Sequence, residues 1–254
     1  MTEGQVAIKN LKISYKTFGN GEKTLLILHG WKSNSERWQK AAELLAEKGV
    51  TVIVPDLPGF GKSQEPSEAW SLDNYVEWLA EFCRQVPGLE DHFYLAGHSF
   101  GGALAAKFAL KYPQKVQKLF LVSAACVRQM KFSKKAWYRL SKMVKIFSFV
   151  PYYPLARKAF YKFILRKTDY LQVDGVMKGT YLKGVSEDLS YKINFLKVPV
   201  VIIWGDKDTS TPIDQARFIH ERIPHSTLIV IPGANHSLQM EVPEQLAEKI
   251  LQNI

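Results

Sequence analysis

The chain of 254 residues contains little cysteine and no long apolar run. Its two cysteines, Cys83 and Cys126, form at most one bridge, which excludes a disulfide-stapled scaffold. We interpret both as buried thiols in a reducing compartment, with a thiol nucleophile at Cys126 as the alternative. No stretch of about 18 apolar residues exists, so no membrane-spanning helix is predicted. The first ten residues also lack the basic and then apolar pattern of a secretory signal, and we expect a cytoplasmic protein.

Motifs for metals, nucleotides and nucleic acids are also missing. No HxxxH, HExxH or clustered cysteine and histidine spacing occurs. No GxGxxG opens a helix after a strand, and residues 59–63 (GFGKS) lack the first glycine of a phosphate loop. The sequence therefore predicts no metal, no other cofactor and no nucleic-acid partner.

Strand and helix signals alternate along most of the chain, which predicts a largely parallel sheet flanked by helices. The strands expected from apolar runs are Val6–Lys9, Lys12–Phe18, Thr24–His29, Val50–Val54, His92–Ala96, Lys118–Ser123, Val200–Trp204 and Thr227–Ile231. Helical periodicity predicts one helix capped by Asn34 or Ser35 that stops at Gly49, and others over Leu72–Val86, Ala103–Lys111, Pro212–Ile223 and Pro243–Gln252.

The alternation breaks over residues 127–197. Aromatic residues at helical spacing there predict three or four short helices, interrupted at Pro151 and Pro154. We therefore expect an α/β core domain made of residues 1–126 and 198–254, with residues 127–197 inserted as a helical lid. Such a lid would lie at the carboxyl ends of the parallel strands, where sheets of this kind bind ligands.

The same segment holds the net charge of the chain, which is +10. Residues 127–197 contain 16 lysines and arginines and four acids, so the segment is +12 and the remainder is −2. Such a field attracts an anionic substrate, an acyl carrier or a lipid surface, or it serves solubility alone. The composition does not choose between these interpretations.

A nucleophile turn is predicted at residues 97–101 (GHSFG), which follow an apolar strand and open a helix. This is the strand–turn–helix setting of a nucleophile elbow. The turn strains the serine backbone and packs strand against helix, so the positions two before and two after Ser99 must be small. Both are glycine, and Ser99 is therefore the candidate nucleophile.

A serine hydroxyl needs a base at neutral pH, and the base needs an acid that sets its tautomer. His236 is the candidate base because it lies on the loop after the last expected strand. His98 adjoins the serine but should point away from its hydroxyl, and His29 is interpreted as a turn residue. The loop after the preceding strand offers Asp206 and Asp208. Asp208 lies deeper in the loop and is favoured, which gives the chain order Ser, Asp, His.

The tetrahedral intermediate requires two preorganised N–H donors. One is expected from the backbone of Phe100, at the start of the helix after the serine. The other is expected from the backbone of Trp31, in the loop that follows the strand Thr24–His29. The Trp31 side chain either walls the acyl pocket or packs under the insertion.

Together these residues resemble the α/β-hydrolase superfamily. The similarity is found in HGW (29–31), DLPGFGKS (56–63), GHSFGG (97–102), WGDKD (204–208) and GANHSLQME (233–241). The resemblance implies an eight-stranded, mostly parallel sheet whose first strand pair is antiparallel, with residues 127–197 as a lid. In that family the acid usually lies three residues after the WG-type glycine, which again selects Asp208.

Ser99 separates this chain from the haloalkane dehalogenases and epoxide hydrolases of the fold, which have aspartate as nucleophile. The chain also lacks the GPGA-like stretch of aromatic ring-cleavage hydrolases and the HGGPG of proline iminopeptidases. The remaining similarity is to carboxylesterases, including biotin-pathway esterases that cleave a methyl ester from an acyl carrier protein. Those enzymes also have an HGW turn and a basic lid.

The leading hypothesis is a carboxylic-ester hydrolase with a Ser–His–Asp catalytic triad. It would act on small-molecule esters with short to medium acyl or aryl groups, through an acyl-enzyme intermediate. The same triad also supports C–C bond cleavage, lactone opening or hydrolysis of an ester or thioester on an acyl carrier protein. A ligand receptor on a hydrolase scaffold is the non-enzymatic alternative.

Overall fold

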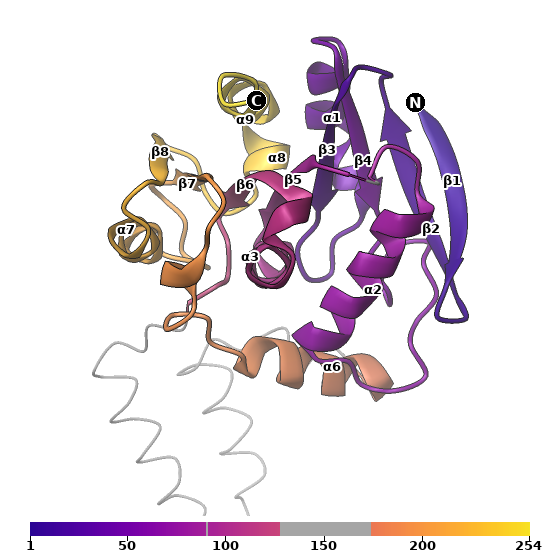
Figure 1. Ribbon diagram of the computed structural model, residues 1–254. Coiled ribbons are helices and arrows are strands. Elements are labelled where there is room, and N and C mark those ends of the chain that lie inside the picture. The colour runs from indigo at the N-terminus through magenta and orange to yellow at the C-terminus, as the bar shows by residue number, and fades with distance from the viewer. Residues whose placement is uncertain (90, 128–173) are drawn as a thin grey trace, which may run out of the picture.

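The computed structural model describes residues 1–89, 91–127 and 174–254. Eight strands form one sheet in the order β1-β2-β4-β3-β5-β6-β7-β8 (Figure 1). They are β1 (Thr2–Ile8), β2 (Leu11–Phe18), β3 (Lys23–Leu28), β4 (Val50–Pro55), β5 (Phe93–His98), β6 (Val116–Val122), β7 (Val200–Gly205) and β8 (Thr227–Ile231). β2 pairs antiparallel with β1 and β4, and every other pair is parallel. The predicted eight-stranded, mostly parallel sheet is confirmed.

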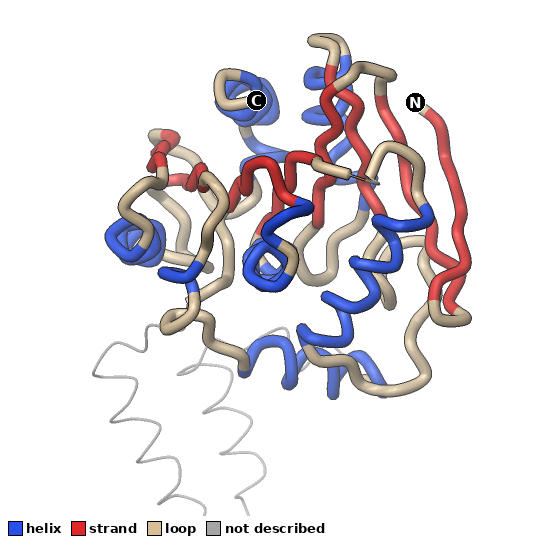
Figure 2. The backbone as a smooth tube through the Cα atoms, in the orientation of Figure 1, coloured by secondary structure: helices blue, strands red, loops and turns tan. Residues whose placement is uncertain are grey.

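Helices cover both faces of the sheet, as the alternation of elements predicts (Figure 2). One face packs against α2 (Leu72–Gln85), α3 (Phe100–Lys111) and α7 (Ile213–Arg222), and the other against α1 (Gln39–Ala46) and α9 (Pro243–Leu251). Successive side chains of a strand point to opposite faces. β3 accordingly sends Leu26 and Leu28 to the first core and Leu25 and Ile27 to the second, all fully buried.

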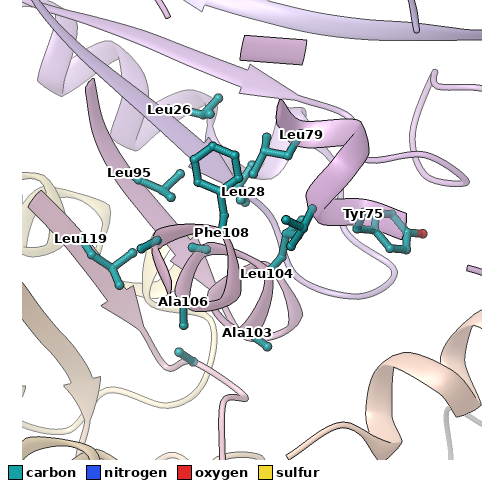
Figure 3. Packing of buried hydrophobic residues seen from close by; sticks show 14 of the residues in the cluster. Leu26, Leu28, Tyr75, Leu79, Leu95, Ala103, Leu104, Ala106, Phe108 and Leu119 are labelled. Atoms are coloured by element: carbon teal, nitrogen blue, oxygen red, sulfur yellow. The ribbon is translucent and has the colours of Figure 1, made fainter. Parts of the chain in front are cut away.

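Figure 3 shows the first core, in which Leu95 of β5 and Leu119 of β6 meet Leu104 and Phe108 of α3. α3 is apolar around most of its circumference, because it lies between the sheet and α2 and is buried on all sides. This burial holds the N-terminus of α3 rigidly at the end of β5. The turn that contains Ser99 therefore rests on a fully buried helix.

Several helix boundaries differ from those expected. α3 begins at Phe100, three residues before the predicted start, because Gly101 and Gly102 are poor helix formers and conceal the first turn in the sequence. The first predicted helix divides into a 3₁₀ turn η1 (Ser35–Trp38) and α1, and Asn34 is its cap. Two short elements were not predicted: η2 (Pro113–Lys115) and α8 (Leu238–Glu241).

The predicted insertion is described only at its two ends. Its carboxyl part contains α6 (Gly175–Ser186) and η5 (Ile193–Phe195). The short helices expected around Pro151 and Pro154 lie outside the described residues, so the lid and its boundaries remain a prediction. Among the described helices, none is long and apolar enough to cross a membrane. Cys83 and Cys126 are both buried and are not joined to each other by a disulfide.

α6 packs on loops that follow the carboxyl ends of β4 and β5. The Trp70 N–H donates to the Thr180 hydroxyl at 2.9 Å. A side chain at Gly184 would meet the ring of Phe100 at 3.0 Å, and Met177 packs closely on Gly59. α6 therefore lies on the side of the sheet where the site was expected.

Candidate active site

Ser99 lies in a strained turn between β5 and α3, with φ 51° and ψ −115°. A non-glycine residue with positive φ is unfavourable and persists only where its surroundings impose it. A Cβ at Gly97 would lie 2.3 Å from the carbonyl oxygen of Gly101, and one at Gly101 would lie 2.2 Å from that of Leu28. The two small positions expected around the nucleophile are therefore required by backbone contact. The Ser99 N–H donates to the carbonyl of Val122 at 3.1 Å, which anchors the turn to β6.

His236 and Asp208 form the predicted acid–base pair. The His236 Nδ1–H donates to Asp208 Oδ2 at 2.8 Å, and the Asp208 side chain has no exposed surface. This bond leaves His236 Nε2 as the nitrogen available to accept a proton. Ser99 and His236 line one cavity of about 150 Å³, which opens beside Trp31. Among the described residues none is hydrogen-bonded to the Ser99 hydroxyl. Of the predicted Ser99–His236–Asp208 line the structure therefore forms the His236–Asp208 bond and not the Ser99–His236 bond, although Ser99 and His236 line the same cavity.

Further donors hold Asp208 as a carboxylate. Its Oδ1 accepts from the backbone N–H groups of Ser210 at 2.8 Å and Thr211 at 2.9 Å, and the Thr211 hydroxyl lies 2.8 Å from Oδ2. Burial opposes ionisation, but hydrogen bonds from His236 and Thr211 outweigh it and lower the pKa of the Asp208 carboxyl. The charged carboxylate thus fixes the tautomer and orientation of His236.

Asp206, the other candidate acid, has a different position. It is exposed, and its Oδ1 accepts from the Gly233 N–H at 2.7 Å, which ties the end of β7 to the loop after β8. The structure thus brings Asp208, and not Asp206, to His236.

The predicted oxyanion donors lie on either side of Ser99. Phe100 is the first residue of α3, where backbone N–H groups have no partner within the helix. Gly30 precedes Trp31, and a Cβ at Gly30 would lie 3.3 Å from the Cβ of Ser99. Neither the Trp31 nor the Phe100 N–H donates to any other described residue. Both groups are therefore available next to the candidate nucleophile.

The Trp31 side chain packs among aromatic rings. Its ring lies 4.8 Å from Phe60 and 5.4 Å from Phe100 in edge-to-face contacts, measured between ring centroids. It also lies 5.2 Å from Tyr181 of α6. The ring therefore packs under the carboxyl part of the insertion, and Trp31 is also one of the residues that line the cavity. That its side chain walls an acyl pocket stays a prediction.

His98, which the sequence reasoning set aside, supports the candidate base. Its ring is buried, lies 4.8 Å from the ring of His236, and its Nε2–H donates to the carbonyl of His236 at 2.8 Å. Burial, reinforced by the proximity of His236, lowers the pKa of His98 to about 3, so it stays neutral. A single sequence offered no signal for this role, because the contact joins residues 138 positions apart.

Two other residues hold the loops of the site. Glu241 accepts from the N–H groups of Asn235 at 2.9 Å and Ser237 at 3.3 Å, and so clamps the residues on both sides of His236. His29 accepts the Leu57 N–H at 2.9 Å, which confirms its interpretation as a turn residue. Burial lowers the pKa of His29 to about 4, which keeps that nitrogen free to accept.

The residues described contain no group of three or more His, Cys, Asp or Glu side chains that could hold a metal ion. Cys126, the alternative nucleophile, is fully buried, and its thiol lies 3.5 Å from the carbonyl of Gly102. It does not line the cavity. Ser99 and His236, in contrast, both line it.

Comparison with known proteins identifies the family of the chain. The family described as serine aminopeptidase, S33, matches residues 19–243. Lipase 1 of Psychrobacter immobilis is 27% identical over 93% of this chain and 78% of its own length. A pimeloyl-[acyl-carrier protein] methyl ester esterase of Nitrosomonas europaea is 29% identical over 92% of this chain and 96% of its own.

A solved membrane phospholipase A shares the fold with a TM-score of 0.76 at 24% identity, over 99% of this chain and 84% of that one. The family match covers most of the residues that form the sheet and the candidate site. The chain therefore belongs to the S33 serine aminopeptidase family of the α/β-hydrolase superfamily, with esterase- and lipase-like relatives.

Proposed function

We propose that this protein is a serine carboxylesterase with Ser99, His236 and Asp208 as its catalytic triad. The observation that carries the proposal is the His236–Asp208 hydrogen bond of 2.8 Å at a cavity that also exposes the strained Ser99 turn. The esterase- and lipase-like relatives support ester hydrolysis as the class of reaction.

In the proposed reaction, the Ser99 hydroxyl attacks the ester carbonyl while His236 Nε2 takes its proton. The Trp31 and Phe100 N–H groups stabilise the oxyanion of the tetrahedral intermediate. His236 then gives the proton to the departing alcohol, which leaves an acyl-enzyme. Water, activated by the same histidine, releases the acid and restores Ser99.

The test is a panel of p-nitrophenyl esters of increasing acyl length, assayed with wild-type protein and a Ser99→Ala variant. We expect turnover of short to medium acyl or aryl esters, and a fall in kcat on the order of 10⁴–10⁶ in the variant. Equal turnover by both proteins would remove Ser99 as the nucleophile. Failure of an organophosphonate probe to label Ser99 would favour a receptor without enzymatic activity. Substrate panels that include lactones, thioesters and C–C substrates test the other reactions open to the same triad.

A second candidate substrate is an ester on an acyl carrier protein. It is favoured by the relative from Nitrosomonas europaea, which this chain matches over nearly its whole length. It also agrees with the charge of +12 on residues 127–197, since acyl carriers are acidic partners. For a carrier-bound ester, kcat/KM should fall steeply with salt, whereas a neutral ester should show no such dependence. A flat salt profile for both substrates would remove this candidate.

A further inference from the structure

The cavity beside Ser99 has a cationic and polar lining that the ester chemistry alone does not use. Lys32, Ser33, Arg37 and Gln239 line it together with Ser99 and His236. None of the described residues that line the cavity is acidic. Its volume of about 150 Å³ exceeds that of one water, roughly 30 Å³, and suits a group of a few heavy atoms.

Four buried polar atoms on residues of this lining have no hydrogen-bond partner among the described residues. They are Trp31 Nε1, the Ser33 hydroxyl, His98 Nδ1 and Oε1 of Gln239, which is 2% exposed. A buried polar atom left unsatisfied costs about 1–3 kcal/mol, so four around one cavity indicate a site built for a polar ligand. The Ser33 hydroxyl can donate a hydrogen bond, and the Gln239 amide carries N–H donors beside its Oε1.

Arg37 supplies a positive charge, which favours a negatively charged ligand. Its backbone N–H donates to Asn34 at 3.3 Å, so it projects from a capped turn. Its guanidinium makes no ion pair with any other described residue, whereas the neighbouring Glu36 pairs with Lys16 at 2.6 Å. Glu241, the acid that follows His236 in the chain, already accepts hydrogen bonds from the N–H groups of Asn235 and Ser237. A guanidinium binds carboxylates in a planar, two-pronged geometry.

We propose that this cavity selects esters that carry a carboxylate a few atoms from the scissile carbonyl, with Arg37 as the specificity-determining residue. Ser33 and Gln239 would donate to the same carboxylate. The proposal rests on the proposed esterase function and narrows its substrate class to monoesters of short dicarboxylic acids. The cavity volume limits the spacer between the two carbonyl carbons to a short chain.

The test compares monomethyl glutarate with methyl hexanoate, two methyl esters of similar length that differ in charge. Both are assayed with wild type, Arg37→Ala and Arg217→Ala. Arg217 is the matched control, because it is an exposed arginine on α7 that pairs with Asp214 and does not line the cavity. We expect kcat/KM for monomethyl glutarate to fall about tenfold in Arg37→Ala alone, with methyl hexanoate unchanged. Arg37→Lys should retain part of the preference.

An equal loss for both esters in Arg37→Ala, or the same loss in Arg217→Ala, would overturn the proposal. A parallel calorimetric measurement uses the Ser99→Ala protein, in which the ester stays intact, with and without Arg37→Ala. This readout needs no turnover. If neither ester is hydrolysed but the anionic ester still binds through Arg37, the esterase function fails and the site remains. If both esters are hydrolysed through Ser99 without a charge preference, the esterase function remains and this inference fails.

Discussion

The nucleophile turn (residues 97–102) and the histidine loop (residues 232–241) hold the two reacting groups of the candidate site in different ways. The turn is fixed by backbone packing. A Cβ added at Gly97 or at Gly101 would lie closer to a neighbouring backbone carbonyl than van der Waals contact allows. The loop is fixed by hydrogen bonds with side chains: the carboxylates of Asp208, Glu241 and Asp206 accept from it, and His98 donates to it.

The difference teaches how each region tolerates change. In the nucleophile turn a substitution cannot be accommodated in part, because an added methyl group must displace the backbone of β3 or α3. Hydrogen bonds to a partly exposed loop are separable, and water replaces some of them. We therefore expect substitutions in the nucleophile turn to have large effects, and those in the histidine loop to have graded effects.

The largest loss of stability and activity should follow when one methyl group is added to the nucleophile turn, and a smaller loss when one is added to the histidine loop. In Gly101→Ala, the Cβ would lie 2.2 Å from the Leu28 carbonyl oxygen, so we expect a loss of about 3 kcal/mol in stability and no ester turnover. In Gly233→Ala, nothing lies within 4 Å and only the positive φ of 77° is unfavourable, which costs about 1–2 kcal/mol. Urea unfolding and an ester assay measure both. Similar losses in the two variants would contradict the contrast between the regions.

The next effect separates the two acids that meet the histidine loop. Asp208→Asn removes the charge that orients His236 and should lower kcat about 10⁴-fold. Asp206→Asn keeps an oxygen that accepts from the Gly233 N–H and should change kcat less than about threefold. Steady-state kinetics on one ester give the kcat of each variant for comparison with wild type. A larger loss in the Asp206 variant would reassign the acid.

Acid should weaken the fold through His98, which joins the two regions. In the unfolded chain His98 takes a proton near its ordinary pKa of 6.5, whereas the folded ring stays neutral until about pH 3. The free energy of unfolding should therefore fall as pH drops below about 6.5, with His98 contributing up to about 1.4 kcal/mol per pH unit. Urea unfolding between pH 7 and pH 4 should show a shallower slope for His98→Gln than for wild type. The exposed His225→Gln should match wild type, and a His98 variant with the wild-type slope would disprove the buried neutral ring.

The smallest effect is expected at Glu241. Glu241→Ala removes the acceptor for the N–H groups of Asn235 and Ser237, but both are exposed enough for water to replace it. We expect a loss of about 1 kcal/mol in stability and a severalfold fall in kcat, because the loop on both sides of His236 loosens. Glu244→Ala, at an exposed acid in the first turn of α9, is the control. Identical kcat values for the two variants would show that the clamp does not position His236.

Local sequence signals were sufficient for most of the fold. All eight strands were predicted. The central ones are apolar runs, since a strand buried on both faces must be continuously apolar, whereas β1 and β2 were predicted as two short strands of a hairpin. The local signals placed the start of α3 three residues too late, because Gly101 and Gly102 are poor helix formers in its first turn. The glycine at position 101 is explained by its close contact with β3, which only the structure shows. The local signals also missed α8, whose four residues are too few to show a period.

The sequence alone predicted the nucleophile turn, the candidate order Ser, Asp, His with Asp208 favoured over Asp206, and the candidate oxyanion loop, because each depends on glycines or short motifs within a few residues. Only the tertiary structure placed Asp208 on His236 and Asp206 on Gly233, and it alone revealed the support of His236 by His98 and Glu241. It also gathered Ser33, Arg37 and Gln239 around one cavity. These contacts join loops after different strands, and their distances are set by how the sheet brings those loops together.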